Sequence, residues 1–249
     1  MPGTDDAAHQ TGNRMSETKD GESVEVSSTV AKYWSGKVYR QVLGTLTKFL
    51  QPKLLASPTA YGTWRLMQLI LKYANYSHLG TRSAMRYLIP RYQGRGDEEA
   101  VAGMRDSAFF FGLVTNLILA AGVAALALVP AFATEVRWGL VTAAVIIMLR
   151  YYHYFLRSLL EANEEFGVVT QSLYVLVTIA FVTTIPLIYL FGIYGLYASV
   201  VTAEAGTVLF LRWKHHLVLE GQFAWGPVWE LLSTGIPIII MNLGEVAIS

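Results

Sequence analysis

The chain has 249 residues with a formal net charge of +1 at pH 7; 53% of its residues are hydrophobic and 15% are charged. Soluble domains carry about 25% charged residues, so this composition indicates a protein that crosses a membrane several times rather than a soluble one. The sequence contains no cysteine, which excludes disulfides, thiolate-bound metals and a thiol nucleophile.

Residues 1–30 are acidic, rich in Ser, Thr and Gly, and poor in large apolar side chains. Segments of this kind cannot bury enough apolar surface to fold, so we predict a disordered tail. The tail lacks the basic start and the continuous apolar core of a cleaved signal peptide. We therefore expect it to lie in the cytoplasm.

Seven later segments reach the roughly 20 residues that a helix needs to cross a bilayer. In chain order they are residues 37–56, 61–79, 107–132, 138–160, 168–191, 194–213 and 227–249, of which the first is the weakest. Their apolar runs are continuous rather than alternating, and only helices or closed barrels satisfy the backbone in lipid. The sequence therefore predicts an all-α fold, a polytopic transmembrane helical bundle.

Basic residues concentrate in alternate connections between these segments. Five arginines lie within 80–106, and Arg212 and Lys214 open the connection over 212–226. Cytoplasmic loops carry such an excess of Lys and Arg, so both connections are expected in the cytoplasm together with the amino terminus.

The segment YGTWRLMQLILKYANYSHLG (61–80) carries polar residues on one helical face. At 100° per residue, Arg65, Gln68, Lys72 and Asn75 fall within one arc. Charged side chains at membrane depth face other protein or a wet cavity, and near a helix end they can instead reach the interface. Lys72 is near mid-span, which favours a cavity, whereas the position of Arg65 fits either explanation.

Segment 138–160 repeats this pattern with Arg150, His153 and Arg157 on one face. The depth of Arg150 favours a cavity, His153 is of a type that is most often packed and satisfied, and Arg157 is close enough to a span end to reach the interface. In the first segment Lys48 shares a polar arc, which indicates either a cavity wall or an interfacial amphipathic helix.

Glu204 stands alone near the middle of segment 194–213. A carboxylate at that depth is expected to be protonated, paired with a cation, or facing water. Three roles remain open: a counter-ion to Lys72 or Arg150, a coupling site for a proton or cation, or a fixed structural ion pair.

These residues together predict a cationic, aromatic-containing cavity suited to a phosphate or pyrophosphate that carries sugars. The candidate substrate-binding residues are Lys48, Arg65, Gln68, Lys72, Asn75, Arg150 and His153, with Glu204 as counter-ion or ion-coupling residue. No Gly-rich phosphate loop of the Walker type occurs, and His215 and His216 have no further ligands at metal-like spacing. We expect no cofactor, no metal and no catalytic residues.

Four stretches carry a family resemblance: LLASPTAYGTWRLMQLILKYANYSHLGTRSAMRYLIPRYQGRGDEEAV, LEANEEFGVVTQ, FGIYGLYASVVTAE and STGIPIIIMNLGE. They place a Tyr-Gly pair after the first span, a Leu-Gly pair at the end of the second, and a Gly-x-Pro at the seventh. In combination, over residues 30–249, the chain resembles bacterial polysaccharide (O-antigen or oligosaccharide-lipid) flippases of the multidrug/oligosaccharidyl-lipid/polysaccharide exporter superfamily.

The resemblance implies a two-lobed exporter of which this chain is an amino-terminal fragment, with the first lobe and the start of the second. The division it implies is a cytoplasmic tail over 1–30, a six-helix transmembrane lobe over 31–213, a cytoplasmic inter-lobe loop over 214–226, and the first helix of a truncated second lobe over 227–249.

The function that the resemblance implies is that of a transporter rather than an enzyme. Such flippases move undecaprenyl-pyrophosphate-linked oligosaccharide across the bacterial inner membrane by alternating access, for polysaccharide or O-antigen biosynthesis. The expected partners are the lipid-linked oligosaccharide, membrane lipids, a polysaccharide polymerase and glycosyltransferases, and no nucleic acid.

Three other functions stay open on the sequence alone. A multidrug or small-cation exporter of the same superfamily would expose carboxylates in its cavity. A membrane polymerase or ligase acting on lipid-linked sugar would need a large outer loop with catalytic residues, and the outer connections here are short. A scaffold that transports nothing would not require charges within spans.

Overall fold

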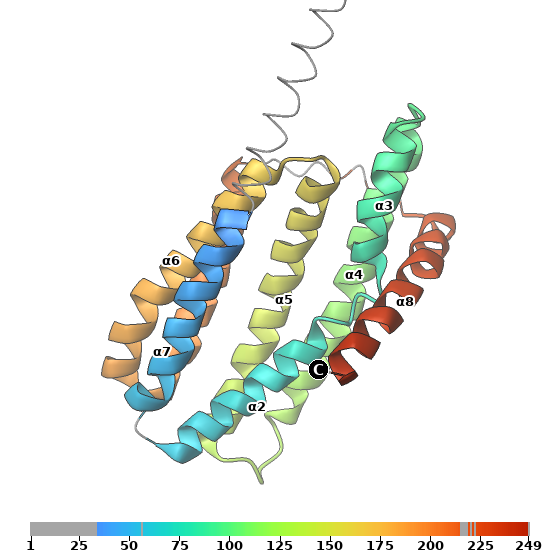
Figure 1. Ribbon diagram of the computed structural model, residues 1–249. Coiled ribbons are helices and arrows are strands. Elements are labelled where there is room, and N and C mark those ends of the chain that lie inside the picture. Colours follow the sequence, from blue (N-terminus) through green and yellow to red (C-terminus); the bar gives the residue numbers. More distant parts are fainter. Residues whose placement is uncertain (1–33, 56, 215–218, 220, 222, 249) are drawn as a thin grey trace, which may run out of the picture.

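The computed structural model describes residues 34–55, 57–214, 219, 221 and 223–248, and all regular elements within them are helices. The predicted tail over residues 1–30 lies outside the described residues. A first helix covers residues 34–55 and is called helix 34–55 below. The others are α2 (Pro58–Ala74), α3 (Thr81–Gln93), α4 (Glu98–Leu126), α5 (Thr134–Ala162), α6 (Phe166–Phe191), α7 (Ile193–Lys214) and α8 (Trp225–Ile248). The all-α helical bundle is thus confirmed (Figure 1).

Helices α4 to α7 are each long and apolar enough to cross a membrane. In α4 and α6 only 22% of the most apolar stretch is buried inside the protein, which leaves most of that surface free to face lipid. Helix 34–55 and α2 are not among these four, because cations interrupt the apolar run of the first and α2 has only 17 residues. The first predicted span therefore folds as a helix that is less apolar than the four membrane-length helices.

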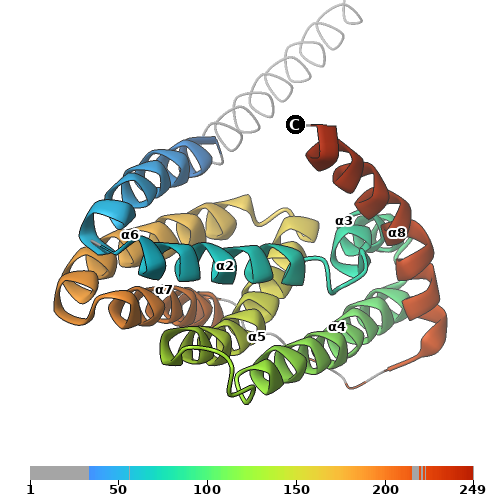
Figure 2. The same ribbon diagram turned by 90° about the horizontal axis from the view of Figure 1, so that it is seen from below.

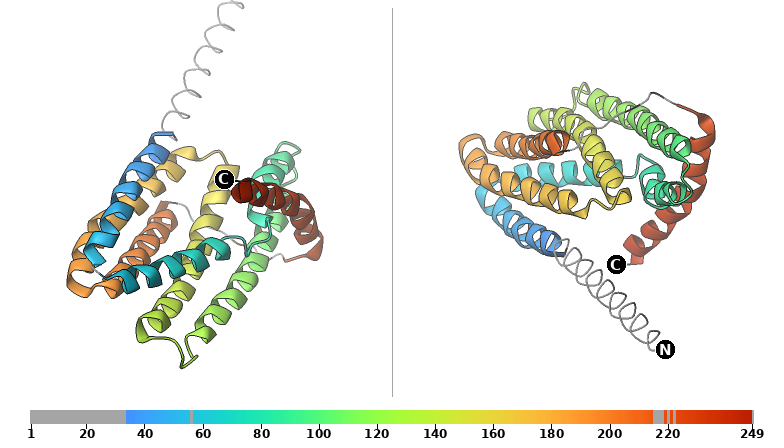
Figure 3. Two further views of the ribbon diagram at one scale, coloured as in Figure 1. Left: turned by 60° about the horizontal axis from the view of Figure 1, so that its bottom comes forward. Right: turned by 90° about the horizontal axis from the view of Figure 1, so that it is seen from above.

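The chain crosses the bundle in alternating directions, with α2 and α3 running the same way one after the other, and the turns between crossings lie at two ends of the bundle (Figure 1). The turn over 94–97, the turn over 163–165, the end of α7 and the start of α8 lie at one end, here called the basic end because Arg91, Arg95 and Lys214 lie there. Helix 34–55 and α8 lie on opposite sides of the bundle (Figures 2 and 3).

Exposed aromatic side chains mark both ends. At the basic end Trp213, Trp225 and Trp229 are 73%, 70% and 74% exposed, and at the opposite end Trp138 and Tyr189 are 56% and 84% exposed. Trp and Tyr concentrate where hydrocarbon meets water, because their rings are apolar and their N–H or O–H groups bind water. The two groups are consistent with a bundle that spans a membrane.

The predicted second span, 61–79, is not one helix. Helix α2 ends at Ala74 and α3 begins at Thr81, and the residues between them form turns. Leu79 (φ 47°) and Gly80 (φ 90°) both have left-handed backbones, which an α-helix cannot contain. A Cβ atom on Gly80 would also overlap the backbone of Gly235 in α8. This close approach of two glycines explains why the break is at this point.

The segment 80–106 was predicted to be a basic loop, and this prediction was wrong because most of the segment is helical. Helix α3 and the first turns of α4 occupy most of it, and the actual turn is limited to residues 94–97. Asp97 begins α4 by accepting a hydrogen bond from the backbone N–H of Ala100 at 3.0 Å, and Glu98 and Glu99 follow in the first turn. Acidic residues there stabilise a helix by offsetting its positive end.

Three apolar clusters hold the bundle together. The first joins α2, α4, α5 and α7 and includes the buried Met67 and Leu196. The second joins α3, α4, α5 and α8 through residues such as Met85 and Leu231, and the third joins α5, α6 and α7 around Leu160. Each fully buried side chain of this size stabilises the fold by about 1.5–3 kcal/mol where it replaces exposure to water.

Helix α8 packs directly against α3 and α4. Leu231 enters the second cluster, Tyr92 donates a hydrogen bond to Glu230 at 2.9 Å, and the backbone N–H of Ala224 donates to Ser107 Oγ at 3.2 Å. The assignment of this helix to a second lobe stays a prediction. Much of the predicted loop over 214–226 lies outside the described residues, and α8 already begins at Trp225.

Candidate functional site

A cavity of about 420 Å³ opens between helix 34–55, α2, α5, α6 and α7. Helix 34–55 forms one wall because its first turns are held on α6, where Ser35 Oγ lies 2.8 Å from Tyr174 Oη and Tyr39 Oη lies 3.2 Å from Thr178 Oγ1. Its last turn reaches α2, where Gln51 accepts a hydrogen bond from Trp64 Nε1 at 3.1 Å.

Most of the candidate residues predicted from the sequence line this large cavity. They are Lys48, Arg65, Gln68, Lys72, Arg150 and Glu204. Asn75 instead lines a smaller pocket next to it, and Arg150 lines both. His153 lines neither, because it is fully buried behind Glu204. The structure thus brings these residues together in space, while their binding of a substrate stays a prediction.

Glu204 is held by two partners from α5. Arg150 Nε donates to its Oε1 at 2.7 Å, and His153 Nδ1 lies 3.0 Å from its Oε2. Because a carboxylate only accepts hydrogen bonds, Nδ1 of His153 is the donor. Nε2 is buried without a hydrogen-bond partner in the described residues. Of the three roles left open for Glu204, pairing with Arg150 is therefore the arrangement present.

The other cations of the large cavity lack such partners. Arg40, Lys48 and Lys72 form no ion pair within the described residues. Arg65 donates to the amide oxygen of Gln68 at 3.1 Å and lies over the Tyr61 ring, 5.7 Å from its centroid. Among the described lining residues Glu204 is the one carboxylate, and it is already bonded. The cavity therefore carries an excess of positive charge.

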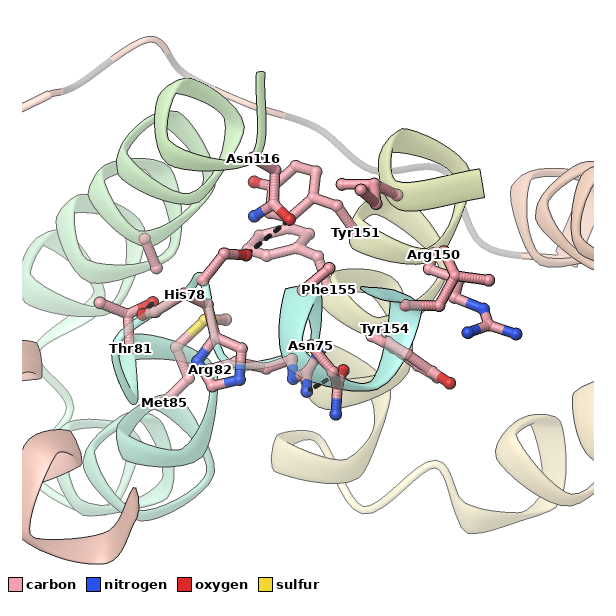
Figure 4. Close-up of a pocket in the computed structure, with 15 residues that line it drawn as sticks. Asn75, His78, Thr81, Arg82, Met85, Asn116, Arg150, Tyr151, Tyr154 and Phe155 are labelled. Carbon is pink, nitrogen blue, oxygen red and sulfur yellow. Dashed lines mark hydrogen bonds between the residues drawn. The ribbon is translucent and has the colours of Figure 1, made fainter. Parts of the chain in front are cut away.

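The smaller pocket lies at the break between α2 and α3 and has a volume of about 30 Å³ (Figure 4). Arg82 is its central charge: Nη2 donates to Asn75 Oδ1 at 3.1 Å, and the guanidinium lies 4.8 Å from the centroid of the Tyr154 ring. Ser77 and Asn116 join α4 to the break by a hydrogen bond of 2.7 Å. In Figure 4 the Arg150 guanidinium points away from Asn75 and Arg82.

Arg157, which the sequence placed near the interface, belongs to a different cluster. Its Nε donates to Glu161 Oε1 at 2.9 Å, and Arg86 Nη1 donates to the other oxygen of Glu161 at 3.1 Å. This cluster links α3 to α5 near the basic end and does not line the large cavity. Both arginines of the cluster therefore have a carboxylate partner within the chain.

Two arginines were not among the candidate residues. Arg40 shares a helical face with Lys48, so the same arc that selected Lys48 also indicated Arg40. Arg82 was assigned to the basic loop. The turns over residues 75–80 interrupt the helical period of α2, so only the folded structure shows that Arg82 lies beside Asn75.

Metal chemistry finds no support in the side chains. Within the residues that the structure describes, no three His, Asp or Glu side chains are placed to hold a metal ion. His215 and His216 lie outside those residues. The side chains around the large cavity are instead cations and amides that surround open space.

No protein-family model matches this sequence, and no curated protein matches it. The fold is similar to a solved structure described as "Reverse polarity of binding pocket suggests different function of a MOP superfamily transporter from Pyrococcus furiosus Vc1 (DSM3638)". The TM-score is 0.62 at 13% sequence identity, and the match covers 84% of this chain and 51% of that one. The chain thus spans about half the length of that transporter. At this identity the match shows the fold alone, and that fold occurs in the superfamily to which the sequence resemblance pointed.

Proposed function

We propose that this chain forms one lobe of a transporter that moves oligosaccharide linked to undecaprenyl pyrophosphate across the bacterial inner membrane. The observation that carries the proposal is the sign of the large cavity. Five cations line it, namely Arg40, Lys48, Arg65, Lys72 and Arg150. The one described carboxylate among the lining residues is bonded to Arg150.

A pyrophosphate with sugars attached suits these groups chemically. Its negative charge offsets the excess of positive charge, and phosphate oxygens accept charge-assisted hydrogen bonds from Lys and Arg. Gln68 and Thr47 also line the cavity and provide donors and acceptors for sugar hydroxyls. The lipid tail needs no polar site, because the exposed apolar surfaces of α4 and α6 are compatible with the hydrocarbon of the bilayer.

In this proposal the amino terminus and the basic end lie in the cytoplasm, as the excess of Lys and Arg at that end favours. The cavity opens alternately to the two sides, with the opposing wall supplied by a second half. The sequence has no phosphate loop of the Walker type, so an ion gradient, the membrane potential or downhill flow drives the movement. Glycosyltransferases would supply the substrate and a polymerase would consume it.

A binding experiment on the purified chain in detergent tests the proposal. Three amphiphiles of matched chain length are compared: a polyprenyl-pyrophosphoryl sugar, an uncharged polyprenyl glycoside of the same sugar, and a quaternary ammonium amphiphile. We expect binding to fall in that order, with the anionic ligand at least tenfold tighter than the uncharged one, a difference of about 1.4 kcal/mol. Preference for the ammonium amphiphile would support the small-cation exporter instead, and equal binding of all three would contradict both.

A further inference from the structure

We propose that the small pocket at the α2–α3 break is a phosphoryl-binding subsite centred on Arg82. The inference deepens the proposed function, on which it rests for the identity of the natural ligand. Its chemistry is that of a phosphoryl group, either as free phosphate or as part of a lipid head group. Of the residues that line this pocket, only Asn75 and Arg150 were among the candidate binding residues predicted from the sequence.

The first observation is a cation without an anion. Arg82 is largely covered by protein, yet it forms no ion pair with any described residue. Its two contacts are neutral: the amide oxygen of Asn75 and the face of the Tyr154 ring. A guanidinium withdrawn from water normally has a carboxylate or phosphate partner, because amides and rings only partly replace its hydration. The pocket provides the place for that missing partner.

The second observation is another donor that lines the same pocket. His78 is 7% exposed and lines the pocket. Its Nδ1 accepts the backbone N–H of Gly80 at 3.0 Å, so its proton is on Nε2. Nε2 has no hydrogen-bond partner among the described residues. A second donor near Arg82 is what a phosphoryl group, with several acceptor oxygens, can use.

The third observation concerns size and position. The volume of about 30 Å³ exceeds the roughly 10–15 Å³ that a single water needs, and is too small for a sugar. The pocket is therefore matched to the oxygens of one small group. Arg150 lines both this pocket and the large cavity, so the two spaces are neighbours.

The substitution Asn75→Asp tests the subsite without changing side-chain size. Asn75 Oδ1 already accepts from Arg82, so an aspartate there supplies the missing anion from within the chain. We expect the affinity for inorganic phosphate, measured by calorimetry on the purified chain, to fall roughly 10- to 100-fold, the size of one charge-assisted hydrogen bond. We also expect the melting temperature without phosphate to rise, because Arg82 gains an ion pair.

A matched variant separates this pocket from its surroundings. Asn163→Asp adds the same charge at an exposed site outside both spaces and should leave phosphate binding within twofold of the original. The same titrations are repeated with polyprenyl phosphate in place of inorganic phosphate. If Asn75→Asp weakens the binding of both ligands, the free ion and the lipid head group use one subsite.

Phosphate binding that survives Asn75→Asp would overturn the inference, and so would a lower melting temperature of that variant in the absence of phosphate. The outcome is independent of the amphiphile experiment. If the polyprenyl-pyrophosphoryl sugar is preferred while Asn75→Asp binds phosphate normally, the subsite is wrong and the proposed function stands. If Asn75→Asp behaves as expected but the amphiphiles bind equally, the subsite stands and the proposed function fails.

Discussion

The cations of the large cavity and those of the Arg86–Glu161–Arg157 cluster differ in what surrounds them. In the cluster both oxygens of Glu161 are bonded to arginines, at 3.1 and 2.9 Å. In the cavity Lys48 and Lys72 have no carboxylate partner among the described residues. Each arginine of the cluster thus has a carboxylate partner within the chain, whereas the two lysines of the cavity need a counter-ion from outside. The comparison separates cations that hold helices together from cations that are free to bind.

The largest expected effect comes from removing Glu204, the carboxylate that lines the large cavity. Glu204→Ala leaves Arg150 without its partner and should lower the free energy of unfolding by about 3 kcal/mol. This is the lower end of the range for buried pairs, because the Arg150 side chain is 30% exposed. Unfolding by denaturant or heat measures the loss. Adding Arg150→Gln should recover part of it, and a loss below about 0.5 kcal/mol would show that the pair is not structural.

A smaller effect, of a different kind, is expected at Lys72. Lys72→Ala should weaken binding of the polyprenyl-pyrophosphoryl sugar about tenfold, or about 1.4 kcal/mol, since it removes one phosphate ligand. The free energy of unfolding should change by less than about 0.5 kcal/mol, because Lys72 is exposed and has no partner. Arg91→Ala, at an exposed position of α3, is the matched control and should change neither quantity. Equal losses in both variants would mean that charge in general, rather than the cavity, attracts the ligand.

The smallest effect is expected in the Arg86–Glu161–Arg157 cluster. Glu161→Gln should lower the free energy of unfolding by about 1 kcal/mol, since Arg86 is 45% exposed and solvent screens its part of the cluster. Binding of the same sugar lipid should stay unchanged. Loss of binding at normal stability would show that this cluster acts on the ligand, and the two regions would no longer differ as described.

The sequence predicted the long apolar helices well, because a continuous run of about 20 apolar residues has few alternatives in lipid. Segments 138–160 and 168–191 correspond to α5 and α6 with only small changes at their ends. The end of the second span at Leu79 and Gly80 was also predicted, from the Leu-Gly pair. The helix α3 that follows was not predicted, and local patterns carry no information on the approach of Gly80 to Gly235, more than one hundred residues away in the chain.

The same contrast applies to the candidate site. Periodicity alone placed Gln68 and Lys72 on one face, and the structure puts that face on the large cavity. The partner of Glu204 could not be chosen from the sequence, because Lys72 and Arg150 are both at similar depth and only the packing of α5 on α7 decides. The position of His153 behind that carboxylate follows from the same packing. Helical periodicity shows which residues share one face of a helix, whereas the distances between residues on different helices follow only from the tertiary structure.

The excess of positive charge in the large cavity can be measured directly with single cysteines, since the chain contains none of its own. Gly44 lines the cavity and a Cβ there meets no other atom within 4 Å, so Gly44→Cys introduces a thiol without displacing neighbours. Ala133→Cys, exposed in the turn before α5, is the reference. Each is reacted with a negatively charged and a positively charged methanethiosulfonate reagent. Cations attract the anionic reagent and favour the thiolate, so the ratio of anionic to cationic rates should be at least about tenfold higher at residue 44 than at residue 133. Equal ratios at the two positions would contradict a cationic cavity.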